Sequence, residues 1–186
     1  MTVKITVDLR SLFGPVRDQG QRPTCLAFAA SDVHAAVRGG FEPLSCEFAF
    51  YNAQRRTGRS PLKGAFLDDM LATILETGQP IEADWPYLQQ LPSDLSRYVP
   101  PLNVGTRFAR DGRELQCHVN EVRGLLDGGR PTIILSALTR RYFSPPNNHV
   151  IDDFDGDAVF PVPRHAMIAV GYGTIGSSRV ILIRNS

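Results

Sequence analysis

The hydrophobic pattern of this chain changes along its length. In the first half, apolar residues recur at helical spacing. Three later stretches instead alternate or are rich in β-branched residues: "PTIILSAL" (131–138), "RHAMIAVGYG" (164–173) and "RVILIRNS" (179–186). Helices first and strands later predict an α+β chain, with a helical lobe, a sheet lobe and a cleft between them that suits a ligand.

Helix start and stop signals divide the first half of the chain. We expect a small-residue, buried helix over 23–39, ended by Gly39-Gly40, and a second helix capped by Ser45. A third pattern runs through "GAFLDDMLATILETGQP" (64–80) and stops at Gly78 and Pro80. One more helix is expected around 119–126. Alternation of Val3, Ile5 and Val7 with polar residues predicts an N-terminal strand.

Length and charge exclude several classes of protein. The 186 residues suit one domain or two small lobes, and 42% apolar with 21% charged residues is ordinary for a globular fold. A net charge of +1 gives no reason to expect nucleic acid or an anionic membrane as partner. No signal-peptide core and no apolar run of membrane-spanning length is present. We expect a protein that is either cytoplasmic or exported without an N-terminal signal peptide.

The cysteines indicate neither a disulfide framework nor a metal site. The chain has three, Cys25, Cys46 and Cys117, and none has zinc-ligand spacing. Free thiols fit a reducing compartment, and one bridge in a secreted protein stays open. The acidic stretch "DDFDGD" (152–157) lacks the glycine and glutamate of a calcium loop, so we expect a solvated turn. "GYGTIG" (171–176) lacks a following helix and predicts a hairpin turn instead of a nucleotide site.

Cys25 lies at the N-terminal end of the helix predicted over 23–39, where unpaired amides and the helix dipole favour a thiolate over a thiol. It is therefore a candidate nucleophile, and the alternative is a small buried hydrophobe. Among the four histidines, His165 begins a predicted strand after a loop, and Asn185 ends the next strand. We expect His165 to serve as the base and Asn185 to orient its imidazole. The order Cys, His, Asn and its spacing are typical of papain-type enzymes.

Three sequence blocks resemble the active-site blocks of the papain family of cysteine peptidases: "PVRDQGQRPTCLAFAA", "HAMIAVGYG" and "ILIRNS". Weaker blocks, "LSCEFAFYNAQR", "GAFLDDMLATILETGQPIEADWPY" and "LLDGGRPTIILSAL", extend the resemblance over nearly the whole chain. It implies a compact, prokaryote-style member, in which no room for an inhibitory propeptide is expected. It also implies one papain-like domain, with a helical lobe over about 10–110 and an antiparallel β-sheet or barrel lobe from 1–9 and 111–186.

The resemblance assigns a role to each candidate residue. Cys25 would be the nucleophile, His165 its proton partner, and Asn185 the acceptor that fixes the imidazole ring. The amide of Gln19 and the backbone N–H of Cys25 would stabilise an oxyanion. Gly64, Ala65 and Phe66 resemble the segment that pairs with substrate backbone, with Ala65 where glycine is common. The implied activity is endopeptidase cleavage of a peptide or protein through an acyl-thioester, with no metal or organic cofactor.

Two departures from the family pattern keep other functions open. The nucleophile is preceded by Arg22-Pro23-Thr24, where we expect Arg22 to be a solvated loop residue. The sequence stops at Ser186, whereas the family pattern continues Trp-Gly after Asn-Ser. The alternatives are a catalytically impaired papain-like module that binds a peptide or protein, and acyl transfer to an amine. Narrow specificity or a regulatory or inhibitory protein partner is expected to control activity, and the sequence indicates no oligomeric state.

Overall fold

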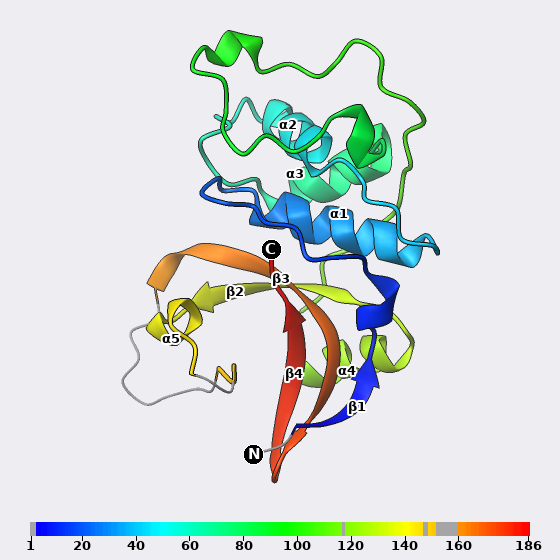
Figure 1. Ribbon diagram of the computed structural model, residues 1–186, viewed down its shortest axis with the longest axis vertical. Coiled ribbons are helices and arrows are strands. Elements are labelled where there is room, and N and C mark those ends of the chain that lie inside the picture. Colours follow the sequence, from blue (N-terminus) through cyan, green and yellow to red (C-terminus); the bar gives the residue numbers. More distant parts are fainter. Residues whose placement is uncertain (1–2, 117, 147–148, 152–159) are drawn as a thin grey trace.

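The computed structural model describes residues 3–116, 118–146, 149–151 and 160–186. Helices α1–α3 lie above the four-stranded sheet in Figure 1, and helix α4 lies against the sheet. The α-helices are α1 (Cys25–Val37), α2 (Cys46–Arg56), α3 (Leu67–Ala72), α4 (Val119–Asp127) and α5 (Arg140–Phe143). The strands are β1 (Lys4–Asp8), β2 (Thr132–Leu138), β3 (Phe160–Ile175) and β4 (Ser178–Arg184). Short 3-10 turns lie at Arg10–Leu12, Glu82–Asp84 and Leu95–Arg97.

Strand β3 organises the sheet. It pairs antiparallel with β2, then with β1 near its own end, and with β4 from residue 168 onward. Two glycines of the "GYG" stretch allow β1 to pair closely, because a Cβ at Gly171 or Gly173 would overlap a β1 carbonyl oxygen. The hairpin turn predicted in "GYGTIG" is confirmed: β3 and β4 are joined at Gly176, which has a φ of +58°.

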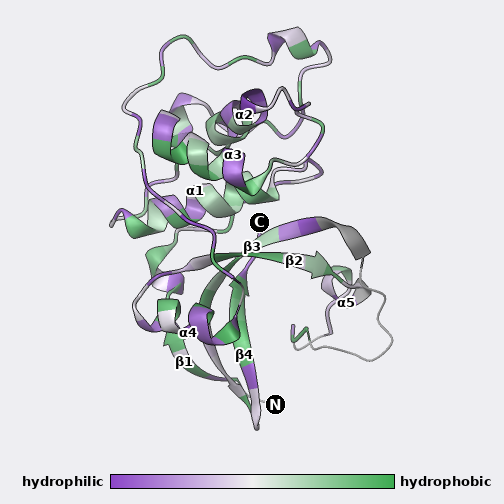
Figure 2. Ribbon diagram, turned by 180° about the vertical axis from the view of Figure 1, so that it is seen from behind, coloured by the Kyte–Doolittle hydropathy of each residue, from purple (hydrophilic) through white to green (hydrophobic). Residues whose placement is uncertain are grey.

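The two faces of β3 pack against different helices. Ala166, Ile168 and Val170 belong to the core that contains α1 and α2. Ala169 and Tyr172 instead belong to a second cluster, with residues of α4. Successive strand residues point to opposite faces, which places Ala169 opposite Ile168 and Val170, and the register shift between Ala169 and Gly171 then brings Tyr172 to the same face as Ala169. In Figure 2 the ribbon is hydrophilic toward the start of β3 and mostly hydrophobic along β4.

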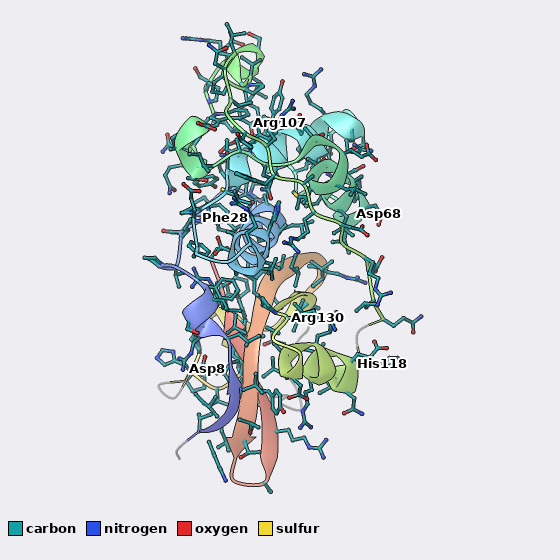
Figure 3. All side chains as sticks on the ribbon, turned by 90° about the vertical axis from the view of Figure 1, so that its right-hand side faces the viewer. Asp8, Phe28, Asp68, Arg107, His118 and Arg130 are labelled. Carbon is teal, nitrogen blue, oxygen red and sulfur yellow. The ribbon has the colours of Figure 1, made fainter. Side chains whose placement is uncertain are left out.

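Helix α1 is buried on nearly all sides, because its small residues let neighbouring elements pack closely against it. Ala27 is fully inaccessible, and Phe28, labelled in Figure 3, is 1% exposed and belongs to the core that α1 shares with β3. The ring of Phe28 also makes an edge contact with Tyr87, at 4.6 Å between centroids. Ser45 caps α2 by accepting a hydrogen bond from the Phe48 backbone N–H, as the sequence predicted. A separate aromatic cluster joins α2 to the loop that follows it. It consists of Phe48 and Tyr51 of α2 together with Trp85 and Tyr98.

Two predicted elements differ from the structure. The third helix changes after Ala72 into a π-helical turn, Thr73–Thr77, which ends at Gly78 with a φ of +71°. Strand β3 begins at Phe160, so His165 lies inside the strand and does not begin it. The prolines at 161 and 163 disguised this start. Proline has no N–H to donate to a neighbouring strand, so it is typical of strand edges and breaks and not of a strand interior.

A buried ionic network joins the helices to the end of the sheet. Asp32 of α1, only 3% exposed, accepts hydrogen bonds from Arg17 at 2.6 Å and from Arg184 at 3.3 Å. Arg184 also donates to the Pro15 carbonyl oxygen at 2.7 Å. The residue that follows Arg184 is Asn185, so this network fixes the chain next to a predicted site residue. Among the described residues, no helix is long and apolar enough to cross a membrane.

Candidate active site

Cys25 is the first residue of α1, and its side chain is half-buried. Thr24 occupies the N-cap position, yet its side chain does not cap the helix. Its hydroxyl pairs instead with the Tyr87 hydroxyl, at 2.9 Å. The first-turn amides of α1 are therefore not taken up by that side chain, and they lie where they favour a negative charge on Cys25.

The thiol of Cys25 is more acidic than an ordinary cysteine. Burial raises its pKa, but interactions with His165 and with the backbone of Ala166 and Leu26 outweigh burial and lower the pKa. The opposite holds for Cys46, which is buried and whose pKa is raised by desolvation. Both thiols are free. The two cysteines thus differ in reactivity, and Cys25 alone of this pair has the surroundings of a nucleophile.

His165 and Asn185 are brought together by neighbouring strands. Nε2 of His165 donates to Oδ1 of Asn185 at 2.6 Å, from β3 to the residue after β4 ends. The other ring nitrogen, Nδ1, is then the one that remains for Cys25. Burial lowers the pKa of His165, but hydrogen bonding with Cys25 and Asn185 raises it by a larger amount. The net shift of the His165 pKa is therefore upward. The Cys, His and Asn of the sequence hypothesis therefore form one continuous array.

Gln19 lies in the loop that leads to Cys25, and several hydrogen bonds hold it there. Its side-chain Nε2 donates to the Arg22 carbonyl oxygen at 3.1 Å, and its own carbonyl oxygen accepts from the Tyr87 hydroxyl at 2.7 Å. Ser186 donates to Oε1 of Gln19 at 3.3 Å. The side-chain amide has a second N–H. No hydrogen bond between Gln19 and Cys25 is observed among the described residues, so the oxyanion role of Gln19 stays a prediction.

The segment 64–66 lies near the same loop. A Cβ at Gly64 would be 3.8 Å from the Pro23 carbonyl oxygen, two residues before the nucleophile. Ala65 packs against the main core, whereas Phe66 is 52% exposed. The Arg59 guanidinium carbon lies over the Phe66 ring, 4.2 Å from its centroid, and Arg59 donates to the Gly64 carbonyl oxygen at 2.5 Å. The segment is thus fixed beside the Cys25 loop, and its contact with substrate stays a prediction.

Arg22 is not the solvated loop residue that the sequence predicted. It is 7% exposed, and its guanidinium forms two hydrogen bonds with the fully buried carboxylate of Glu47, at 2.6 and 2.8 Å. It also donates to the Leu88 carbonyl oxygen. The prediction failed because Glu47 comes from α2, 25 residues later, and local sequence does not show this partner. The charge of Arg22 is neutralised inside the helical lobe.

Several other predictions concern metals and loops. Among the described residues, no group of three or more His, Cys, Asp or Glu side chains could hold a metal ion. The acidic stretch 152–157 and Cys117 lie outside the described residues.

A cavity of about 130 Å³ lies between α4 and the far end of the sheet, lined by residues that include Arg123, Tyr172 and Arg179. It does not include Cys25 or His165.

One residue beside the site was missed by the sequence reasoning. Tyr142, on α5, lies with its ring centroid 5.3 Å from that of His165. Nothing in "LTRRYFSPP" signals this contact, because α5 is a single short turn that follows β2. Only the pairing of β2 with β3, in which Ser136 is opposite His165, brings this part of the chain to the site.

Helices α1–α3 pack on one face of an antiparallel sheet and α4 on the other, with the helix-terminal Cys25 beside the strand residue His165, and this arrangement has the papain-like fold. This α+β fold, predicted from the sequence, is confirmed by solved structures. One, from a comparison of antibody cross-reactivity between the mite allergens Blo t 1 and Der p 1, superposes with a TM-score of 0.72 at 20% identity. Xylellain, a cysteine protease from Xylella fastidiosa, gives 0.68 at 19%, and digestive procathepsin L 3 of the Tenebrio molitor larval midgut gives 0.65 at 18%.

The chain is shorter than these structures. All of it is covered in the first and third comparisons and 92% in the second, but it spans only 62% of the first solved chain, 70% of the second and 60% of the third. No protein-family model matches the sequence, and a search of curated proteins gives no match. The shared property is therefore the fold.

Proposed function

We propose that this protein is a cysteine endopeptidase that cleaves peptide bonds through Cys25, His165 and Asn185. The observation that carries the proposal is the juxtaposition of a helix-terminal thiol of lowered pKa with a histidine that is hydrogen-bonded to Asn185. A buried structural cysteine needs neither a lowered pKa nor a histidine beside it. Cys46 is such a cysteine, because burial raises its pKa and no histidine contributes to that pKa. A thiolate next to a positioned imidazole is the arrangement that nucleophilic acyl transfer requires.

The reaction has two halves. In the first, the Cys25 sulfur attacks the peptide carbonyl carbon and forms a C–S bond, while the carbonyl oxygen becomes negative. The backbone N–H of Cys25 and the amide of Gln19 donate hydrogen bonds to that oxygen. His165 then gives its proton to the amide nitrogen, the C–N bond breaks and the amine leaves.

In the second half, water hydrolyses the thioester. His165, now neutral, takes a proton from water, and the oxygen attacks the acyl carbon and displaces the Cys25 sulfur. Asn185 holds the ring so that the same nitrogen serves both steps. Residues 64–66 would lie along the acyl part of the peptide, because they are adjacent to the loop that precedes Cys25.

The test is hydrolysis of a pool of quenched fluorescent decapeptides by the wild type, Cys25→Ala and Cys46→Ala. Wild type and Cys46→Ala should cleave peptides, and Cys25→Ala should not. Iodoacetamide at limiting dose should modify Cys25 first, as located by mass spectrometry. Peptide cleavage that survives in Cys25→Ala would refute the assignment. Fast alkylation of Cys25 without any cleavage by the wild type would also refute it, and would favour a peptide-binding module.

A further inference from the structure

The hydroxyl of Tyr87 bridges the two ends of the loop that leads from Gln19 to Cys25. It donates a hydrogen bond to the Gln19 carbonyl oxygen at 2.7 Å and lies 2.9 Å from the Thr24 hydroxyl. A phenol has one proton and a carbonyl oxygen can only accept, so in the second hydrogen bond Thr24 is the donor and Tyr87 the acceptor. One hydroxyl group thus connects Gln19 to the residue directly before the candidate nucleophile.

The ring of Tyr87 is held in place on several sides. Its backbone N–H donates to Oε1 of Glu82 at 2.9 Å, and its ring makes the edge contact with Phe28, at 4.6 Å between centroids. The guanidinium carbon of Arg22 lies 5.0 Å from the centroid of the same ring. These contacts lock the side chain, so the hydroxyl is a fixed anchor for the loop.

The loop also has hydrogen bonds of its own. The Arg22 carbonyl oxygen accepts from Nε2 of Gln19 at 3.1 Å and from the Thr24 backbone N–H at 2.8 Å. Gly20, with a φ of +57°, allows the chain to turn between them. These bonds shape the loop internally, whereas the Tyr87 hydroxyl ties both of its ends to a different segment of the helical lobe.

The two ends of this loop carry the two oxyanion donors of the proposed reaction. One is the side-chain amide of Gln19, and the other is the backbone N–H of Cys25. Such donors are effective only when both lie about 2.7–3.1 Å from the position that the oxyanion will occupy. The separation of Gln19 and Cys25 must therefore be fixed before a substrate binds, and Tyr87 contacts Gln19 and the neighbour of Cys25.

We propose that the Tyr87 hydroxyl is a positioning group for the oxyanion site, which sets the separation of the two donors by bridging Gln19 and Thr24. This inference rests on the proposed function and adds a residue to it. Tyr87 does not contact substrate in this role. A hydroxyl that only stabilised the fold would change the free energy of unfolding, whereas a positioning hydroxyl also changes the rate of each step in which an oxyanion forms.

The first experiment compares the wild type with Tyr87→Phe, which keeps the ring and removes both hydrogen bonds. With one decapeptide chosen from the pool that the wild type cleaves, kcat should fall about tenfold, a part of the roughly 10²–10³-fold that loss of an oxyanion donor costs. KM should change little, because the hydrogen bonds strengthen in the transition state. Alkylation of Cys25 by iodoacetamide, at a pH where the thiol is ionised, should keep its rate, because displacement at a saturated carbon forms no oxyanion. An unchanged kcat in Tyr87→Phe would overturn the inference.

Further variants show whether Tyr87 acts through Gln19. In the Gln19→Ala background, Tyr87→Phe should lower kcat much less than in the wild type, because the donor that it positions is absent. The matched control is Tyr172→Phe, which loses a hydrogen bond to Asp127, so that stability should fall and kcat should not. If Tyr87→Phe does not fold, Thr24→Val removes one half of the bridge and should also lower kcat. Losses that multiply fully in Gln19→Ala/Tyr87→Phe would overturn the inference.

The second experiment separates this inference from the proposed function. With the p-nitrophenyl ester of N-acetylglycine, the Cys25 sulfur attacks the ester carbonyl carbon, a C–S bond forms, the C–O bond breaks and p-nitrophenolate leaves. Its absorbance gives the rate of the first turnover, which should fall about tenfold in Tyr87→Phe, as for the peptide.

The outcomes of the two experiments are distinct. If the wild type cleaves no peptide but ester acylation slows in Tyr87→Phe, the proposed function fails and the inference holds. If peptide cleavage depends on Cys25 but neither kcat nor acylation depends on Tyr87, the inference fails and the proposed function holds. A wild type that neither cleaves peptides nor is acylated would overturn both.

Discussion

Asn185 lies 2.6 Å from His165, although the two residues are 20 positions apart and only the β3–β4 pairing connects them. This hydrogen bond has two consequences. It fixes the plane of the imidazole, and it raises the pKa of His165, as does the interaction with Cys25. The bond is therefore both a positional and an electrostatic device, and these two effects can be separated by experiment.

Replacing Asn185 with alanine should lower kcat/KM by roughly 10- to 100-fold, because a misplaced catalytic group costs about this much. It should also move the alkaline limb of the pH–rate profile to lower pH. The reason is that the hydrogen bond from His165 to Asn185 stabilises the protonated imidazole, so without it the proton is lost earlier. A pH profile of peptide cleavage measures both effects. A fall in rate with an unmoved alkaline limb would contradict the electrostatic part.

The pH dependence of thiol alkylation should report the Cys25–His165 pair directly. The pKa of Cys25 is lowered, so iodoacetamide should react at pH values below those that an ordinary thiol needs. In His165→Ala, the thiolate loses its stabilising partner, and the midpoint of the alkylation curve should move to higher pH. The rate is followed by mass spectrometry at Cys25, with Cys46 as the internal reference. A midpoint that stays in place in His165→Ala would contradict the coupling.

Asp32→Ala should destabilise the fold strongly, by about 3–5 kcal/mol, because it removes the buried carboxylate that pairs with both Arg17 and Arg184 and leaves Arg17 only its ion pair with Glu82. Urea unfolding measures this difference. The matched control is Asp8→Ala, which removes an exposed ion pair with Arg10 and should have a much smaller effect. Because Arg184 precedes Asn185, Asp32→Asn should also reduce kcat/KM under conditions where the protein is folded. Equal unfolding of the two alanine variants would show that the network does not hold the lobes together.

The buried pair of Arg22 and Glu47 should show strong coupling. Glu47→Ala leaves a buried guanidinium unpaired and should cost about 3–5 kcal/mol of unfolding free energy. The double variant Arg22→Met/Glu47→Leu, which replaces both charges by apolar side chains, should be more stable than Glu47→Ala. Tyr98 and Leu88 also donate hydrogen bonds to Glu47, so some cost should remain in the double variant. Additive losses in the double-mutant cycle of Arg22→Met, Glu47→Leu and the variant that combines them would contradict the coupling.

Local pattern was sufficient for most elements of the fold. The Ser45 cap, the small-residue helix after Thr24 and the alternating "HAMIAVGYG" were all readable, because caps and periodicity are properties of neighbouring residues. The π-helical turn at 73–77 and the start of β3 at Phe160 were not. Both depend on what lies beside the segment, and a proline reads as a break unless its free strand edge is known.

The candidate site divides in the same way. The sequence by itself determined the residue types, since a cysteine at a helix start, a strand histidine and an asparagine at the next strand end follow from order and spacing. Only the tertiary structure decided the environment of those residues: Arg22 buried on Glu47, Tyr142 against His165, and Arg184 tied to Asp32. The physical reason is that pKa shifts and buried ion pairs arise from groups far apart in the chain, and their energies depend on burial and distance, which exist only after folding.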